Sequence, residues 1–457
     1  QKLLISDTFR ETIIAHGYER ASTFSWTKAV DLSLNAFNQA LSEHPAKNLD
    51  IVNTEQSASD QRSRLIMDVT STALSPVLSG IQRVMHNLAK AALKQNATEK
   101  NQTVLSYCKD RSGWYALSEL SKPAVKLLPQ NRFTFENNDS YLLLDSSWTF
   151  IEGQEPRLAD ALVCGEEVVH GIHDIGPLTM SAMTDEGMPP AFRRWFEFVL
   201  GYSTGIVCVS RAVADEVYQL IEDIKLPRPM KVGYFRLGAD FADVEPDVSE
   251  LGFTKTRPTF LMVGTIEPRK GQYYGLKAFE KLWEQGVDVN LVIVGKAGWD
   301  TKLLQAMLEN HPERENRLFW RQGISDSGLS AAYQEADALI MTSYLEGFGL
   351  PVVEAGRKNC PVILADLPVF REVGEGAPKA TYFDVGSADS LAETIENYIE
   401  NELGSRDKAA DTRWPNWEQS AQEVKDVVLN GNWYKYYEPE HILPNTTFQD
   451  IGEVFTQ

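Results

Sequence analysis

Residues 342–355, which read Thr-Ser-Tyr-Leu-Glu-Gly-Phe-Gly-Leu-Pro-Val-Val-Glu-Ala, decide the fold of this chain. They follow an apolar run, residues 338–341, that is typical of a buried parallel strand. Pro351 fits the first turn of a helix, where a missing N–H costs no hydrogen bond. A strand, a glycine loop and a helix start in this order predict an anion site. The free amides and the positive end of the helix dipole point beyond the strand.

Two glycines and two glutamates determine the chemistry of this stretch. Gly347 and Gly349 allow backbone amides to approach a ligand closely. Glu346 lies in the predicted loop and Glu354 in the predicted helix. A carboxylate beside an anion site repels the anion, so it must serve another purpose. Adjacent sugar or ribose hydroxyls suit it, because a carboxylate can accept from both. An ordinary strand–loop–helix unit with solvated glutamates is the alternative.

In this context the Glu-x7-Glu pattern resembles the donor-site signature of the glycosyl transferases group 1 family, whose members are retaining, nucleotide-sugar-dependent enzymes. The resemblance implies an α/β fold of GT-B architecture, in which two Rossmann-like parallel-sheet domains face a cleft. It also implies that Glu346 positions the donor sugar and that Glu354 holds the ribose. The remaining donor-binding residues of the stretch would be Gly347, Phe348, Gly349 and Leu350.

A second segment supplies positive charge. Residues 259–271 read as a strand that ends near Gly264, followed by Arg269 and Lys270 at a helix start. Arginine makes bidentate contacts and lysine is a mobile point charge, so the pair suits a phosphate; a solvated basic pair is the alternative. The resemblance covers this segment and implies that Arg269 and Lys270 grip the donor diphosphate beside Gly264. It further implies that Ile324 meets the nucleotide base.

The first half of the chain carries two more parts of the pattern. A predicted strand within residues 168–178 ends in His173 and Asp174, and ligands of open α/β sheets bind outside such strand ends. By resemblance, His173 reaches the donor sugar and Asp174 orients its ring. We expect His170 in the core. Gly80, before a predicted helix, resembles the family's loop that faces the donor phosphates.

The length of 457 residues is too great for one ordinary core. We predict an N-terminal helical extension and linker over residues 1–62 and a Rossmann-like acceptor domain over residues 63–245. A Rossmann-like nucleotide-sugar donor domain follows over residues 256–408. By resemblance, a helix over residues 413–430 crosses back to the first domain, and residues 431–457 form a tail.

Composition restricts the partners. A net charge of −20 argues against nucleic acid and against docking to anionic lipid by bulk charge. The four cysteines are far apart in sequence, which favours buried thiols in a reducing compartment over disulfides. No signal peptide or membrane-spanning run is visible, so we expect a cytoplasmic protein. The amphipathic segment at residues 24–41 packs on its own protein or makes a peripheral contact with the inner membrane or a partner enzyme.

Together these parts predict a retaining hexosyltransferase that adds to a glycan or lipid-linked glycan, in bacterial surface-polysaccharide (O-antigen) synthesis. The motifs at residues 79–83 and 268–271 resemble those of mannosyl- and rhamnosyltransferases, which favours GDP-mannose as donor. UDP- and dTDP-sugars are alternatives, with glucosyl or rhamnosyl transfer, and an epimerase or phosphorylase would share the architecture. A nucleotide-sugar-binding scaffold that has lost catalysis is the alternative of another class. We expect no metal and no cofactor, because the basic pair already offsets the diphosphate charge.

Overall fold

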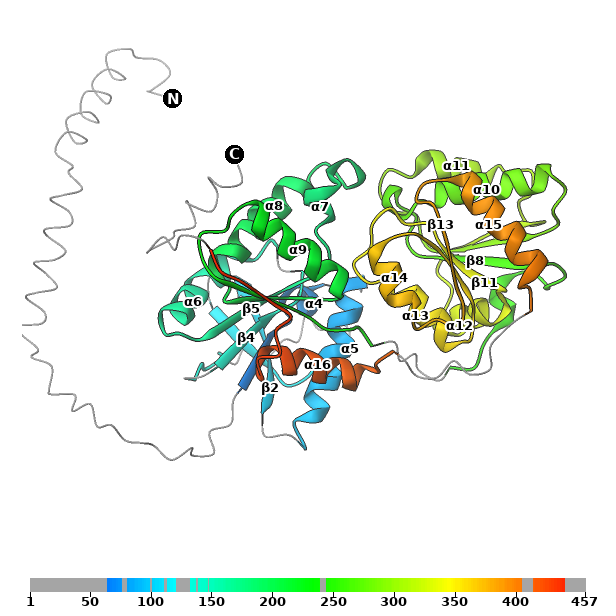
Figure 1. The fold of residues 1–457 in the computed structure, drawn as a ribbon. Coiled ribbons are helices and arrows are strands. Elements are labelled where there is room, and N and C mark those ends of the chain that lie inside the picture. Colours follow the sequence, from blue (N-terminus) through cyan, green and yellow to red (C-terminus); the bar gives the residue numbers. More distant parts are fainter. Residues whose placement is uncertain are drawn as a thin grey trace, which may run out of the picture. The chain divides into compact units, whose positions relative to one another are not determined.

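The structure is a computed structural model, and the elements that it describes are drawn as ribbons in Figure 1. It describes residues 64–75, 80–98, 101–110, 113–120, 132–136, 139–146, 148–238, 244–404 and 414–439. The chain divides into Gln1–Gln61 and Arg62–Gln457, and every element below belongs to the second part. The predicted helical extension and the end of the predicted tail lie outside the described residues. Within the described part of the chain, no helix is long and apolar enough to cross a membrane.

The N-terminal domain is built on a sheet of eight described strands. These are β1 (Arg64–Asp68), β2 (Gln102–Asp110), β3 (Gly113–Leu117), β4 (Asp139–Leu143), β5 (Glu167–Ile172), β6 (Gly205–Cys208), β7 (Met230–Tyr234) and β14 (Lys435–Tyr437). Their order is β3-β2-β1-β4-β5-β6-β7-β14. The strands from β2 to β7 pair in parallel, whereas β3 and β14 are antiparallel at the two edges. All of β6 is buried, as expected for a parallel strand covered on both faces.

Helices connect these strands. They are α4 (Thr70–Leu74), α5 (Gly80–Gln95), α6 (Ile151–Val163), α7 (Gly176–Thr179), α8 (Met188–Tyr202) and α9 (Arg211–Asp223), with a 3-10 turn at Ser181–Met183. The apolar faces of α8 and α9 pack against β6 and β7 in one cluster that contains Phe196, Val213 and Val217. Each such fully buried side chain stabilises the fold by about 1.5–3 kcal/mol relative to an exposed one.

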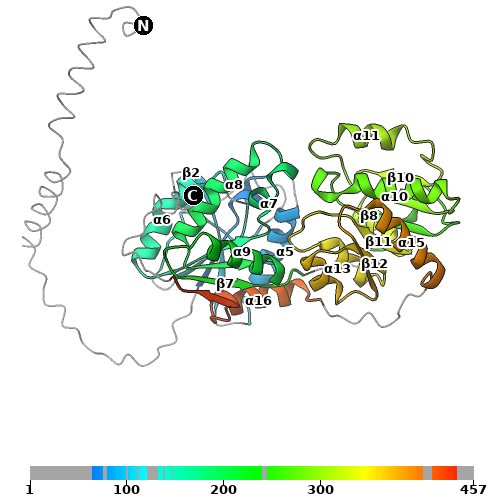
Figure 2. The same cartoon turned by 45° about the horizontal axis from the view of Figure 1, so that its top comes forward.

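The C-terminal domain is built on six described strands that are all parallel. They are β8 (Thr259–Val263), β9 (Asn290–Val294), β10 (Leu318–Arg321), β11 (Ala338–Met341), β12 (Val362–Ala365) and β13 (Ala380–Phe383). The helices are α10 (Gln272–Glu284), α11 (Lys302–Glu309), α12 (Asp326–Glu335), α13 (Leu350–Arg357), α14 (Pro368–Gly374) and α15 (Ala388–Asn401), with 3-10 turns at Val248–Leu251 and Pro268–Lys270. Helices α10 and α11 cover one face of the sheet and α12 and α13 the other (Figures 1 and 2).

The two sheets share a strand order, although β3 is antiparallel to β2 whereas β10 is parallel to β9. The second has the order β10-β9-β8-β11-β12-β13, and the first contains the same pattern as β3-β2-β1-β4-β5-β6. In each, the chain starts at the centre, winds outward to one side, and then returns to build the other side. The order therefore reverses between β1 and β4, and again between β8 and β11. Ligands of open α/β sheets bind at such a reversal, beyond the carboxyl ends of the strands.

After the second sheet the chain contacts the N-terminal domain again through α16 (Trp417–Val428) and β14. A helix was predicted from residue 413, but it begins at Trp417 because Asn416 and Gln419 form a capping box. The Lys425 ammonium of α16 donates to Gln95 of α5 at 2.8 Å. Strand β14 was not predicted, since three residues are too few to show an alternating pattern.

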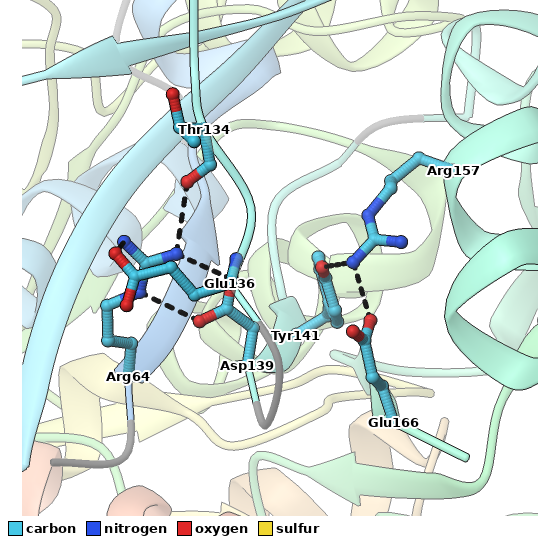
Figure 3. A network of polar contacts seen from close by, with 7 residues as sticks. All are labelled: Arg64, Thr134, Glu136, Asp139, Tyr141, Arg157 and Glu166. Atoms are coloured by element: carbon cyan, nitrogen blue, oxygen red, sulfur yellow. Dashed lines mark hydrogen bonds and ion pairs between the residues drawn. The ribbon is translucent and has the colours of Figure 1, made fainter. Parts of the chain in front are cut away.

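A polar network secures the amino-terminal edge of the first sheet (Figure 3). The Arg64 guanidinium at the start of β1 donates to both carboxylate oxygens of Asp139 at the start of β4, at 2.8 and 2.7 Å. Arg157 of α6 pairs with Glu166 at 2.5 Å and also contacts the Tyr141 hydroxyl. These residues lie at the opposite strand ends from the reversal sites, so we interpret this network as structural.

Candidate functional site

The reversal between β8 and β11 joins the two segments that the sequence singled out. The loop after β8 contains Arg269 and Lys270, and the loop after β11 contains Tyr344 and Glu346. The Tyr344 amide donates to the Arg269 carbonyl at 2.8 Å. The Thr342 hydroxyl donates to the Lys270 carbonyl at 2.7 Å. Two direct hydrogen bonds therefore hold the basic segment against the glutamate loop.

Lys270 and Glu346 form an ion pair at the centre of this site. The Lys270 ammonium contacts one oxygen of Glu346, and the Ser343 hydroxyl donates to the same oxygen at 2.8 Å. Burial raises the pKa of Glu346, but the charges of Lys270 and Arg269 and these hydrogen bonds outweigh it, so the pKa lies below its usual value. The carboxylate is therefore ionised at neutral pH, although its side chain is only 8% exposed.

Arg269 adds a second positive charge beside this pair. Its guanidinium donates to Glu267 at 2.9 Å. Burial lowers the pKa of Arg269, but the negative charges of Glu346, Glu267 and Asp174 outweigh that effect and raise it. The site thus contains two cations whose present partners are carboxylates of the protein itself.

The glycine loop has no room for side chains. A Cβ on Gly347 would lie 1.9 Å from the His173 carbonyl oxygen. Gly349 has φ of 88°, and a Cβ there would lie 2.9 Å from the Phe370 ring. Helix α13 follows with Pro351 in its first turn, as predicted. Phe348 is buried and Leu350 is the first residue of the helix, so the loop is fixed on both sides.

Glu354 lies one turn into α13 and is also buried. The Tyr333 hydroxyl of α12 donates to one carboxylate oxygen at 2.7 Å, and Arg83 of α5 is 3.9 Å from the other. Burial raises the pKa of Glu354, while Arg83 and Tyr333 lower it by less. The sequence predicts no role for Tyr333. A tyrosine on a buried helix face is usual in a core, and nothing in the local pattern indicates a partner 21 residues later in the chain.

His173 follows β5, as predicted, but its ring contacts the backbone. Its Nε2 is 2.9 Å from the Leu144 carbonyl, which requires the proton on Nε2. Burial lowers the pKa of His173 more than the Leu144 bond and Asp174 raise it, so the ring is neutral. Asp174 accepts from the Gly176 amide at 3.0 Å and thereby stabilises the start of α7. His170 is fully buried, which confirms its predicted place in the core.

The other predicted donor residues, Gly80, Gly264 and Ile324, lie at the start of α5, after β8 and after β10. Gly80 opens α5 with open space where a Cβ would be. Gly264 donates to the Val294 carbonyl at 2.9 Å at the end of β8. The close approach is at Gly295, where a Cβ would lie 1.9 Å from the Gly264 oxygen; no donor role was predicted for this glycine. Ile324 is half-buried between β10 and α12. Within the part of the chain that is described, no three His, Cys, Asp or Glu residues cluster as metal ligands.

Comparisons with known proteins agree with this geometry. Residues 243–413 match the family described as "Glycosyl transferases group 1". The serotype-specific mannosyltransferase WbdA of Escherichia coli is 30% identical over 463 residues, covering 92% of this chain and 57% of that protein. The O-antigen chain mannosyltransferase RfbU of Salmonella typhimurium is 32% identical over 138 residues, covering 30% of this chain and 38% of that protein. The chain thus spans little more than half the length of the WbdA relatives.

Two solved structures share the fold. The sucrose-phosphate synthase from Thermosynechococcus elongatus superposes with a TM-score of 0.57 at 15% identity, covering 81% of this chain and 99% of that one. A structure titled trehalose-6-phosphate from E. coli, bound with UDP-2-fluoro glucose, superposes with a TM-score of 0.52 at 12% identity, covering 81% and 96%. The predicted fold, two Rossmann-like parallel-sheet domains of GT-B architecture, is confirmed.

Proposed function

We propose that this chain, a member of the glycosyl transferases group 1 family through its residues 243–413, is a retaining hexosyltransferase that uses a nucleotide-sugar. The observation that supports this most is the partly buried Lys270–Glu346 ion pair beside Arg269, at the reversal of a Rossmann-like sheet. Two cations at a helix start suit a diphosphate, and an ionised carboxylate beside them suits the hydroxyls of the attached sugar.

Binding of the donor would exchange one set of partners for another. The diphosphate takes the place of Glu346 as the counter-charge of Lys270, and Arg269 binds it as well. Glu346 is then available to accept hydrogen bonds from the sugar hydroxyls. In our proposal Glu354, oriented by Tyr333, accepts from the ribose hydroxyls. The glycine loop and the first amides of α13 contribute further donors to the phosphates.

The reaction breaks the bond between the anomeric carbon and the diphosphate oxygen and forms a bond from that carbon to an acceptor hydroxyl. Negative charge develops on the leaving diphosphate, and Lys270, Arg269 and the amides of α13 stabilise it. In our proposal the acceptor attacks on the side of the leaving group, and the departing phosphate takes the hydroxyl proton, which retains the configuration. No metal step is needed, because the cations of the protein already offset the charge.

We propose mannose as the sugar and a glycan or lipid-linked glycan of a surface polysaccharide as the acceptor. The support is that the relatives described above are mannosyltransferases, one of them an O-antigen chain enzyme. GDP-mannose is accordingly the favoured donor. Glucosyl or rhamnosyl transfer at the same site is the nearest alternative. A nucleotide-sugar-binding scaffold without turnover is the alternative from another class.

The test is an assay of nucleotide release and sugar transfer with the full chain. GDP-mannose, UDP-glucose and dTDP-rhamnose are each incubated with manno-oligosaccharide acceptors, and products are followed by mass spectrometry and NMR. We expect GDP-mannose to give elongated products with an α-anomeric linkage. Release of GDP above the rate without enzyme, dependent on acceptor, supports transfer. Inversion of configuration would contradict the proposed chemistry, as would a requirement for a divalent metal that a chelator abolishes.

A further inference from the structure

The start of α9 in the N-terminal domain is bound by two groups of the C-terminal domain. The first three amides of a helix have no partner within the helix. At α9 the Val213 amide donates to the Ser210 hydroxyl at 3.2 Å. The Arg211 and Ala212 amides donate to the two carboxylate oxygens of Glu372 at 2.9 and 2.8 Å. Glu372 belongs to α14, so one domain caps a helix of the other.

The same helix start also holds the glycine loop. The Ser210 hydroxyl donates to the Gly347 carbonyl at 2.7 Å while it accepts from Val213. Ser210 is fully buried, so this hydroxyl has its hydrogen-bonding needs met by these two contacts. Gly347 follows Glu346 directly, and its Cα is pressed against the His173 carbonyl, because a Cβ would lie 1.9 Å from that oxygen. Leu345 packs on Gly176, where a Cβ would meet it at 2.4 Å.

These contacts restrict the peptide on which Glu346 is mounted. Glu346 is bounded by Leu345 and Gly347, and each of these neighbours touches the N-terminal domain. A carboxylate that must accept from sugar hydroxyls has to be placed within a fraction of an ångström. Negative charge at a helix N-terminus is favourable, so the Glu372 cap stabilises the arrangement in which Ser210 reaches Gly347.

We propose that Ser210 and Glu372 are positioning residues that fix the Glu346 loop against the N-terminal domain. This inference rests on the proposed function, since it assigns Glu346 to the donor sugar. Neither residue touches the donor in this account. Ser210 acts on the Gly347 carbonyl, and Glu372 acts on the amides that orient Ser210. Their loss should therefore reduce turnover through misplacement of Glu346, and not through loss of a phosphate contact.

Hydrogen exchange tests the contact without any need for turnover. In the wild-type chain we expect the Arg211 and Ala212 amides to be protected, although they open a helix. Glu372→Ala should increase their exchange rates by about tenfold or more, because two hydrogen bonds to a charged group are lost. Glu372→Gln should have an intermediate effect, since the amide oxygen still accepts one bond. Fast exchange of both amides in the wild type would overturn the proposal.

Kinetics test the positioning role. Ser210→Ala and Glu372→Ala should each lower kcat by about tenfold, with a smaller change in the KM of the donor. Ser210→Thr keeps the hydroxyl group, so it should retain most of the wild-type kcat. The two losses should not add, since both act on one contact. Ser387→Ala is the matched control for a lost helix cap, because Ser387 caps α15 within its own domain by accepting from Ser390.

Glu393→Gln is the control for a lost charge, as Glu393 is exposed on α15. Both controls should leave kcat within about twofold of the wild type. If Ser210→Ala retains wild-type kcat while its helix remains folded, the positioning role is wrong. If the wild type itself transfers no sugar with any donor, the proposed function fails, and the exchange rates of Arg211 and Ala212 still decide whether the contact exists.

Discussion

The two reversal sites of this molecule have the same strand order, but their buried carboxyl groups have pKa values shifted in opposite directions. Between β1 and β4, burial raises the pKa of Asp68 to about 8 and that of Asp145 to about 6. Between β8 and β11, the charges of Lys270 and Arg269 keep the pKa of Glu346 below its usual value in spite of burial. The first site therefore holds a protonated carboxyl at neutral pH, while the second holds ions.

The difference in pKa between the two sites follows from the groups that contact each carboxyl group. Asp68 accepts from the hydroxyl of Thr70 and from Gln154 at 3.1 Å, and the Asp145 carboxylate accepts from the Thr72 amide at 2.6 Å. Those hydrogen bonds connect α4 and α6 to the ends of β1 and β4, so we interpret these carboxyl groups as stabilising the fold. At the second site the charged groups bind one another and can exchange partners when a diphosphate arrives. The same strand order therefore places structural carboxyl groups at the reversal in one domain, and charged groups that can exchange partners at the reversal in the other.

Removing a charge from the second site should have the largest effect. We expect Lys270→Ala or Glu346→Ala to lower turnover at least about a hundredfold, the scale of losing a contact to transition-state charge. The matched control is Lys277→Ala, which breaks a surface pair with Glu280 in the same domain and should change turnover little. The measurement is kcat with the preferred donor. Near-normal rates in either site variant would disprove the assignment of the pair.

Glu354→Gln should have the next largest effect, because it replaces one acceptor oxygen of the proposed ribose-binding carboxyl group by an amide donor and keeps the shape. A buried partner left unsatisfied costs about 1–3 kcal/mol, so we expect the KM of the donor to rise by about tenfold. Tyr333→Phe removes only the bond that orients this carboxylate, and should raise KM by less. Initial-rate kinetics over a range of donor concentrations measure both. An unchanged KM in Glu354→Gln would place the ribose elsewhere.

The first reversal site predicts an effect on stability. The pKa of Asp68 is about 8 in the folded protein and about 4 when unfolded, so the folded state binds the extra proton between these values. The contribution of Asp68 to the free energy of unfolding should therefore fall as pH rises from about 6.5 to about 8, by about 1 kcal/mol per unit. His170, whose pKa burial lowers to about 3, is neutral in the folded protein but binds a proton near pH 6.5 in the unfolded chain. It therefore opposes this slope at the lower end of the window, and it does so equally in the wild type and in the variants.

Asp68→Asn should flatten that slope in urea unfolding at several pH values. The substitution is well accommodated, because among the described residues the Gln154 Oε1 has no hydrogen-bond partner and could accept from the new amide. Asp145→Asn is the matched control. The pKa of Asp145 is about 6, so its proton is already lost over most of the window and the wild-type slope should persist. An equal slope in Asp68→Asn would show that Asp68 is ionised in the folded protein.

The smallest expected effect concerns His173. Burial lowers the pKa of His173 below its usual value, which favours the neutral ring whose Nε2–H donates to Leu144. We expect the pH profile of kcat from about pH 8 to about pH 6.5 to have the same shape in the wild type and in His173→Asn, which keeps an N–H donor. A wild-type loss near pH 6.5 that is absent from the variant would show that His173 titrates.

The sequence predicted the strands and the motif loops well, because apolar runs bounded by glycine are local signals. Residues 338–341 form β11, and Pro351 opens α13 with its neighbour Leu350, as the local pattern requires. Local patterns do not say which side chains meet. The sequence suggested separate partners for Lys270 and Glu346, and the structure pairs them because β8 and β11 are neighbours in the sheet.

Other contacts were beyond prediction for the same reason. The partner of His173 is the backbone carbonyl of Leu144, directly after β4. Every residue has such a carbonyl, so the sequence cannot indicate which one a histidine contacts. Glu372 lies on an ordinary amphipathic helix, and its role depends on a helix start 160 residues earlier. Of the residues at the first reversal site, Asp68 ends β1 and Asp145 follows β4, and only their burial distinguishes them from solvated carboxylates.

The central claim is that the charged reversal site binds a nucleotide-sugar through Lys270. A thermal-shift measurement tests it most directly, with GDP-mannose, UDP-glucose, UDP-N-acetylglucosamine and dTDP-rhamnose, and with the bare nucleotides. A ligand at about a hundred times its dissociation constant adds roughly 2.7 kcal/mol to the stability. We predict that the GDP compounds raise the Tm of the wild type and that Lys270→Ala abolishes the rise. A folded wild-type protein whose Tm responds to none of these ligands would contradict the account.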